Sequence, residues 1–118
     1  MERTRTMFEE RERGYEAKWA HDAELLFRIM ARRDNKLGEW AAARMTLHDS
    51  RIDDYVAAVV EAGVAGVPGK GPDPVLEKIR ADFAAKGVVV ADDELVAKAL
   101  ALREEAEAHF GVAGRAGN

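Results

Sequence analysis

The chain contains no proline before Pro68, so the first half of its 118 residues is free to form long, uninterrupted helices. Strand signals are scarce by comparison. The one run of three β-branched residues, Val88 to Val90, lies between a glycine and an acidic triplet and is too short to found a sheet by itself. We interpret that run as a packed linker, and the sequence therefore predicts an all-α protein.

The longest helical pattern lies within the first 45 residues. Large apolar side chains recur there at steps of three, four or seven residues, which is the period of one helix face. They are Tyr15, Trp19, Leu26, Met30, Leu37 and Trp40. A helix of about 30 residues is roughly 45 Å long, which is more than a domain of this size needs to cover its core. Part of this first helix is expected to project from the body or to fray.

A second helix is expected to begin near Asp49 or Ser50, both good N-caps, and to end at Gly63 or Gly66. Valine and isoleucine side chains supply its apolar face: Ile52, Val56, Val59 and Val60. The stretch from Gly63 to Pro72 is rich in glycine and contains two of the three prolines. It is predicted to be the longest flexible connection in the body.

Two further helices follow this connection. The third is predicted to have Asp73 as N-cap, Pro74 as its first residue and Gly87 just after its end. Its apolar face consists of Val75, Leu76, Ile79 and Phe83. The fourth begins with acidic residues, which favour the positive end of a helix, and its apolar stripe consists of Leu95, Ala99, Leu102, Ala106 and Phe110.

Four amphipathic helices bury their apolar faces best against one another, which predicts a compact four-helix bundle. Residues 19–110 are assigned to this bundle and residues 111–118 to a disordered tail. Residues 1–18 are predicted to form a mobile N-terminal arm, because residues 2–18 contain five basic and five acidic side chains but only three large apolar ones. The fold class expected is therefore all-α, with a long first helix and a mobile arm.

Composition excludes several classes of function. The net charge of −4 is unsuited to general nucleic-acid binding, which requires a broadly basic face. The chain has no cysteine and hence no disulfide framework or thiolate zinc site. The apolar stretches fall far short of the roughly 20 residues that span a membrane, and the charged N-terminus is unlike a secretory signal. We expect a cytoplasmic protein without direct membrane insertion.

Enzymatic motifs are weak. The loop from Gly66 to Gly71 is similar to a phosphate-binding loop, but Val64 stands where the first glycine is needed and Gly71 where a serine or threonine is needed. A metal on His21 and Glu24 would require further ligands that the pattern does not supply. The serines and threonines lack a nucleophile motif. We expect no catalytic residues, no metal and no cofactor.

A basic stripe runs along the first helix. Arg28, Arg32 and Lys36 recur every four residues, and Arg33 lies beside them. One interpretation is a solvated face that pairs with Glu24 and Glu39. The other is contact with an acidic surface or with phosphate, including that of adenine nucleotide.

The first helix also carries a specific resemblance. The chain resembles the zeta subunit family of alphaproteobacterial F-type ATP synthases over most of its length, and most sharply in this helix. The residues that carry the likeness are Phe8-x-x-Arg11, Glu16 to Asp22, Ala31 to Arg33, Leu37-Gly38-x-Trp40-Ala41-Ala42, Asp82 to Ala84 and Gly87-Val88. The fold that this resemblance implies is a four-helix bundle, in agreement with the helical pattern.

The function that the resemblance implies is intrinsic inhibition of ATP hydrolysis by the catalytic head of the synthase. The N-terminal segment of such proteins becomes helical as it inserts between the catalytic subunits and the central rotor, so the implied partners are the alpha, beta and gamma subunits. The protein would then lie in the cytoplasm, peripheral to the inner membrane. The implied contacts lie in the arm: Met7, Phe8, Glu9, Arg11, Arg13, Tyr15, Lys18 and Trp19.

The sequence departs from the family pattern at Gly14, Tyr15 and Trp19 and in the glycine-rich connection. Gly14 costs about 1 kcal/mol relative to alanine in a helix and marks a hinge in the arm. Binding of adenine nucleotide, or a role in assembly without strong inhibition, is therefore kept as an alternative. A metal- or carboxylate-based hydrolase is a third hypothesis, but no sequence motif favours it.

Overall fold

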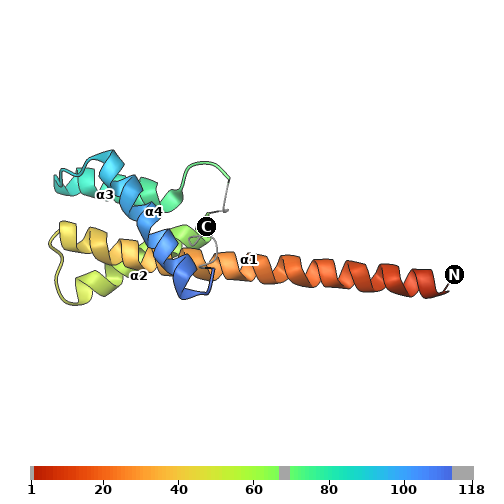
Figure 1. Ribbon diagram of the computed structural model, residues 1–118. Helices are drawn as coiled ribbons and strands as arrows, with labels where there is room; N and C mark the ends of the chain where they lie inside the picture. The colour runs from red at the N-terminus through yellow and green to blue at the C-terminus, as the bar shows by residue number, and fades with distance from the viewer. Residues whose placement is uncertain (1, 67–69, 113–118) are drawn as a thin grey trace.

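The computed structural model describes residues 2–66 and 70–112, and from residue 21 onward it also describes the side chains. This part of the chain contains four helices and no strand (Figure 1). The helices are α1 (Glu2–Arg44), α2 (Ser50–Ala65), α3 (Pro74–Lys86) and α4 (Asp92–His109). The prediction of an all-α, four-helix protein is confirmed. Residues 113–118 of the predicted tail lie outside the described residues.

Helix α1 is far longer than the other three. Its 43 residues correspond to roughly 65 Å of helix, and it continues through Gly14 without a break. The other three helices gather around its C-terminal half, so its N-terminal half projects away from the body (Figure 1). This projection explains the elongated outline of 69 × 31 × 27 Å. The expectation that part of the first helix projects is confirmed.

The core lies where α2, α3 and α4 pack around the C-terminal half of α1. Leu37 of α1 is fully buried at its centre, together with Val59, Val75 and Ile79. The other buried members of this core are Ala41, Met45, Phe83, Leu95, Ala99 and Leu102.

Helix α1 enters the body gradually. Residues 21–24 are exposed, Leu25 and Leu26 are half-buried, and Ile29 is the first residue in the described part of α1 that is buried. The predicted stripe agrees in part, because Leu37 is buried whereas Leu26, Met30 and Trp40 are half-buried. The side chains of Tyr15 and Trp19 lie outside the described part, so the boundary of the arm at residue 18 stays a prediction.

The helix ends follow the capping signals with one exception. Asp73 caps α3 by accepting hydrogen bonds from the amides of Val75 at 3.0 Å and Leu76 at 3.5 Å, and Gly87 ends it with φ +71°. Asp49 precedes α2 as expected, but its side chain makes no capping hydrogen bond, because its backbone adopts φ +56°. Helix α2 is capped at its C-terminus by Gly66, so Gly63 lies inside it.

The connection between α3 and α4 is only partly packed. Val88 and Val90 are half-buried against the core, whereas Val89 is 96% exposed. Two ion pairs fix the first turn of α4, just after this connection. Arg80 of α3 pairs with Asp92, and Arg44 of α1 pairs with Glu94. The interpretation as a packed linker therefore holds for two of the three valines.

The membrane prediction also has a structural counterpart. Within the described residues, no helix is both long enough and apolar enough to cross a bilayer.

Candidate functional site

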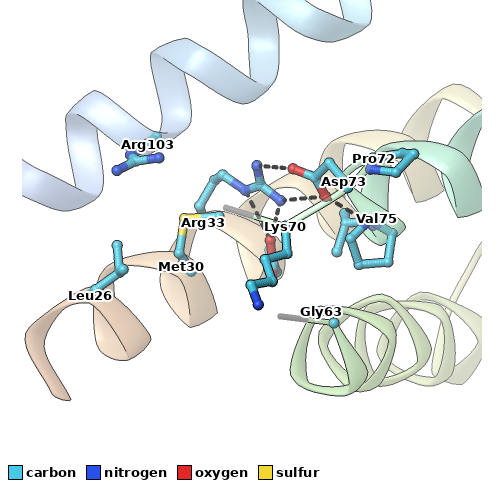
Figure 2. A pocket seen from close by; sticks show the side chains of 13 residues that line it. Leu26, Met30, Arg33, Gly63, Lys70, Pro72, Asp73, Val75 and Arg103 are labelled. Atoms are coloured by element: carbon cyan, nitrogen blue, oxygen red, sulfur yellow. Dashed lines mark hydrogen bonds and ion pairs between the residues drawn. The ribbon is translucent and has the colours of Figure 1, made fainter. Parts of the chain in front are cut away.

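A buried ion cluster joins α1 to the start of α3. Arg33 and Asp34 are neighbours on α1, and both are buried, at 5% and 4% exposure. The guanidinium of Arg33 donates to Asp34 Oδ1 at 2.9 and 2.7 Å and to the two carboxylate oxygens of Asp73 at 2.8 and 3.3 Å (Figure 2). We call Arg33, Asp34 and Asp73 the Arg33 cluster. One guanidinium thus fixes the position of the residue that caps α3.

The two carboxylates of the Arg33 cluster have opposite pKa shifts. Burial raises the pKa of Asp34 above its ordinary value, although the charge and hydrogen bonds of Arg33 act in the other direction. Burial also acts to raise the pKa of Asp73, but its hydrogen bonds from Arg33 and from two backbone amides outweigh burial and lower the pKa. Asp73 is therefore firmly ionised. The ionised form of Asp34 is disfavoured by burial and is stabilised by the charge and hydrogen bonds of Arg33.

Gly63 of α2 leaves room for this cluster. A Cβ atom at this position would lie 2.1 Å from Oδ2 of Asp34 and 3.2 Å from Cγ2 of Val75. Real Cβ atoms do not approach other atoms so closely, so the Asp34 carboxylate occupies the space that a side chain would fill. The close contact between α1, α2 and α3 thus requires a glycine here.

A pocket of about 410 Å³ opens beside the Arg33 cluster. Leu26, Met30 and Val75 form part of its apolar lining, and the loop before α3 supplies Lys70. Figure 2 shows Asp73 on one side of Arg33 and Arg103 of α4 on the other. The other lining residues are Asp34, Gly63, Gly66, Gly71, Pro72, Asp73 and Pro74.

The charges of this pocket favour an anionic ligand. Both lining carboxylates, Asp34 and Asp73, are already paired with Arg33. Lys70 is exposed and has no ion-pair partner among the described residues, and Arg103 lies 3.8 Å from the carboxylate of Glu107. The arrangement can therefore hold an anionic group beside an apolar surface. In the described part of the chain, no three metal-binding side chains converge.

The predicted basic stripe divides into two kinds of residue. Arg28 pairs with Glu24 at 2.7 Å and Lys36 with Glu39 at 3.7 Å, both on the exposed surface of α1, as the solvated-face interpretation predicts. Arg32 is half-buried and has no ion pair within the described residues. Arg33 differs from these three, because it is buried and lines the pocket. The stripe is thus not one continuous binding surface.

The predicted arm contacts fall on the projecting part of α1. The side chains of Met7, Phe8, Glu9, Arg11, Arg13, Tyr15, Lys18 and Trp19 lie outside the described part of the structure, so their roles stay predictions. The sequence did not predict that Lys70 and Arg103 line the same pocket. Only the similarity of the Gly66–Gly71 loop to a phosphate-binding loop pointed to Lys70, and no sequence signal pointed to Arg103.

The fold and site define a class of small four-helix protein in which the long first helix projects beyond the body. The family model of the ATPase inhibitor subunit zeta matches residues 5–109, which is most of the chain. The protein therefore belongs to the ATPase inhibitor subunit zeta family. No curated protein and no solved structure matches the chain significantly. An inhibitor subunit is regulatory rather than catalytic, and this family implies ATP synthase as the partner.

Proposed function

We propose that the protein binds the catalytic head of an F-type ATP synthase through its N-terminal segment and blocks ATP hydrolysis. The observation that carries this proposal is the projection of α1. Its first buried residue in the described part is Ile29, and the helix begins at Glu2, so several turns extend beyond the core. A projecting helix can enter a groove that the body itself is too wide to enter.

The sequence of the arm suits such a groove. Phe8 and Tyr15 supply apolar anchors, and Arg11 and Lys18 supply cations for carboxylates. These contacts lie between the alpha, beta and gamma subunits of the head, where an inserted helix opposes rotation of the central rotor. The protein acts from the cytoplasm as a peripheral subunit.

Deletion of residues 1–19 tests the proposal. The truncated chain should fold but should no longer inhibit ATP hydrolysis by the purified catalytic head from the same organism. Arg11→Ala should weaken inhibition, whereas Arg51→Ala, which removes an exposed arginine from α2, should not. Inhibition that is equally strong without the arm would refute the proposal.

Binding of adenine nucleotide is a second candidate function, and the pocket favours it. Lys70 and Arg103 can approach phosphate oxygens, while Leu26 and Met30 supply an apolar surface for a base. Of the four basic residues predicted from the sequence, only Arg33 lines this pocket.

Titration with ATP, followed by backbone amide shifts, tests nucleotide binding. The largest shifts are expected at Lys70, Gly71 and Arg103, and Lys70→Ala should reduce affinity more than Lys86→Ala, which removes an exposed lysine from the far end of α3. Unperturbed amides at millimolar ATP would rule out this second function.

A further inference from the structure

Helix α4 has an exposed apolar surface on the side opposite its core residues. Val96 is 43% exposed and Leu100 is 58% exposed, and they lie one helical turn apart. Ala97 and Ala101 are also exposed and widen this surface. Leu95, Ala99, Leu102 and Ala106 meanwhile face the core. Helix α4 is therefore apolar on two sides, although the body covers only one.

Acidic residues lie at both ends of this surface. At 100° per residue, Asp93 and Glu104 fall within about 40° of Leu100 around the helix, one to two turns away along it. Both are exposed, and neither has an ion-pair partner among the described residues. Lys98 falls on the opposite side of the helix. Arg103 falls about 60° from Leu100, at the border between this surface and the pocket, and its guanidinium lies 3.8 Å from the carboxylate of Glu107. We call Asp93, Val96, Ala97, Leu100, Ala101 and Glu104 the α4 face.

We infer that the α4 face binds a partner helix with an apolar centre and a basic residue on each side of it. If the proposed function is correct, this helix belongs to the catalytic head of the ATP synthase. Leu100 and Val96 would pack against its apolar centre, and Asp93 and Glu104 would pair with its cations. The body of the protein thus has a contact of its own, separate from that of the arm.

The charges favour this occupant over two others. A second copy of the chain, paired antiparallel about Ala97 and Leu100, would place Asp93 of one protomer against Glu104 of the other. A parallel pair would place each acid against its own copy. Like charges repel at such distances, so self-association through this face is disfavoured. An anionic membrane surface is disfavoured for the same reason.

Two contacts on one chain reinforce each other. The α4 face lies on the body, whereas the arm projects from it (Figure 1). Once the body is docked, insertion of the arm becomes an intramolecular step at a high effective concentration. The truncated chain that lacks residues 1–19 should therefore retain weak binding to the catalytic head, even though it no longer inhibits.

The test compares Leu100→Glu with Val64→Glu in the full chain. The two residues have the same exposure of 58%, and Val64 lies on α2, away from the α4 face. We expect Leu100→Glu to weaken binding to the purified catalytic head about tenfold, because it places a charge in an apolar contact, whereas Val64→Glu should not weaken it. Thermal unfolding of both variants checks that the fold is intact.

A second pair of variants leaves the apolar residues in place. Asp93→Lys combined with Glu104→Lys should also weaken binding, most at low salt, whereas Asp53→Lys combined with Glu61→Lys on the exposed side of α2 should have little effect. Sedimentation velocity of the unmodified chain should show a monomer; a dimer dissociated by Leu100→Glu would overturn the inference in favour of self-association.

The two proposals fail in different ways. Unchanged binding by both Leu100→Glu and the double lysine variant, while deletion of the arm abolishes inhibition, would overturn the α4 face alone. An arm deletion that inhibits normally, combined with weak binding by Leu100→Glu, would overturn the arm and support the α4 face. If the unmodified chain does not bind the catalytic head, both are wrong.

Discussion

Arg33 is buried and holds two carboxylates, that of buried Asp34 and that of half-buried Asp73. Leaving a buried guanidinium without its partners is costly, so Asp34 and Asp73 are needed once Arg33 is buried. In return, the cluster fixes the spacing between α1 and the first turn of α3. The packing around the cluster is so close that one added carbon atom at Gly63 would overlap the carboxylate of Asp34.

Gly63→Ala should destabilise the fold by about 2 kcal/mol, although alanine is the better helix former. The added methyl group would collide with Oδ2 of Asp34, and its displacement would disturb the pairing with Arg33. Urea unfolding measures the loss. Ala57→Gly at an exposed position of α2 calibrates helix propensity in the same helix. A more stable Gly63→Ala variant would show that the cluster tolerates this displacement.

Tyr55 gives a pH dependence on the alkaline side. Its hydroxyl donates to Asp82 at 2.7 Å, and burial together with this carboxylate raises its pKa well above the ordinary value near 10. Above pH 10 the unfolded chain therefore loses this proton before the folded chain does, and stability falls as the pH rises.

Tyr55→Phe should remove this part of the alkaline loss. Because Tyr55 is only half-buried, solvent screening limits the effect to about 1 kcal/mol at pH 11. The measurement is the free energy of unfolding of both chains between pH 8 and about pH 11. Near pH 8 the variant should be slightly less stable, because its hydrogen bond to Asp82 is lost. Parallel pH profiles would contradict the assignment.

At the scale of elements, the start of α3 combines a cap with an ion pair. Asp73→Ala should cost about 2–3 kcal/mol, because it removes the acceptor for two backbone amides and one partner of Arg33. Asp73→Asn keeps the cap and should cost roughly half as much. Urea unfolding separates the two contributions, and equal losses in both variants would assign the whole effect to the ion pair.

The arm of α1 contains one residue that opposes helix formation. Gly14→Ala should favour the helical arm by about 1 kcal/mol and strengthen inhibition of ATP hydrolysis about fivefold. Circular dichroism should show slightly more helix at the same time. A gain in helix without stronger inhibition would mean that the arm binds in another conformation.

At the scale of the molecule, the N-terminal half of α1 projects away from the body that the other helices form (Figure 1). All buried residues in the described side chains lie at or after Ile29. Deletion of residues 1–19 should therefore shift the thermal midpoint by no more than about 2 °C. Small-angle scattering should show a maximum dimension well below the 69 Å extent of the full chain. A large drop in the midpoint would place part of the stabilising packing in the arm.

The sequence alone determined which segments are helical and where most of them end. Proline-free length, apolar period and local caps are properties of neighbouring residues, so Asp73, Pro74 and Gly87 could be placed correctly. The same holds for the exposed pairs of Arg28 and Lys36, whose partners lie three or four residues away. Local geometry suffices for these features because a helix fixes which residues are neighbours.

Only the tertiary structure decided the site. Arg33 and Asp73 are 40 positions apart, and their pairing depends on how α1 and α3 meet. Gly63 suggests a helix end by its residue type, yet it lies inside α2, where Asp34 of α1 occupies the space that a side chain would fill. Lys70 and Arg103 are also far apart in the sequence, and they line one pocket because of how the helices pack. Burial and long-range contact depend on the packing of whole faces, which no single helix contains.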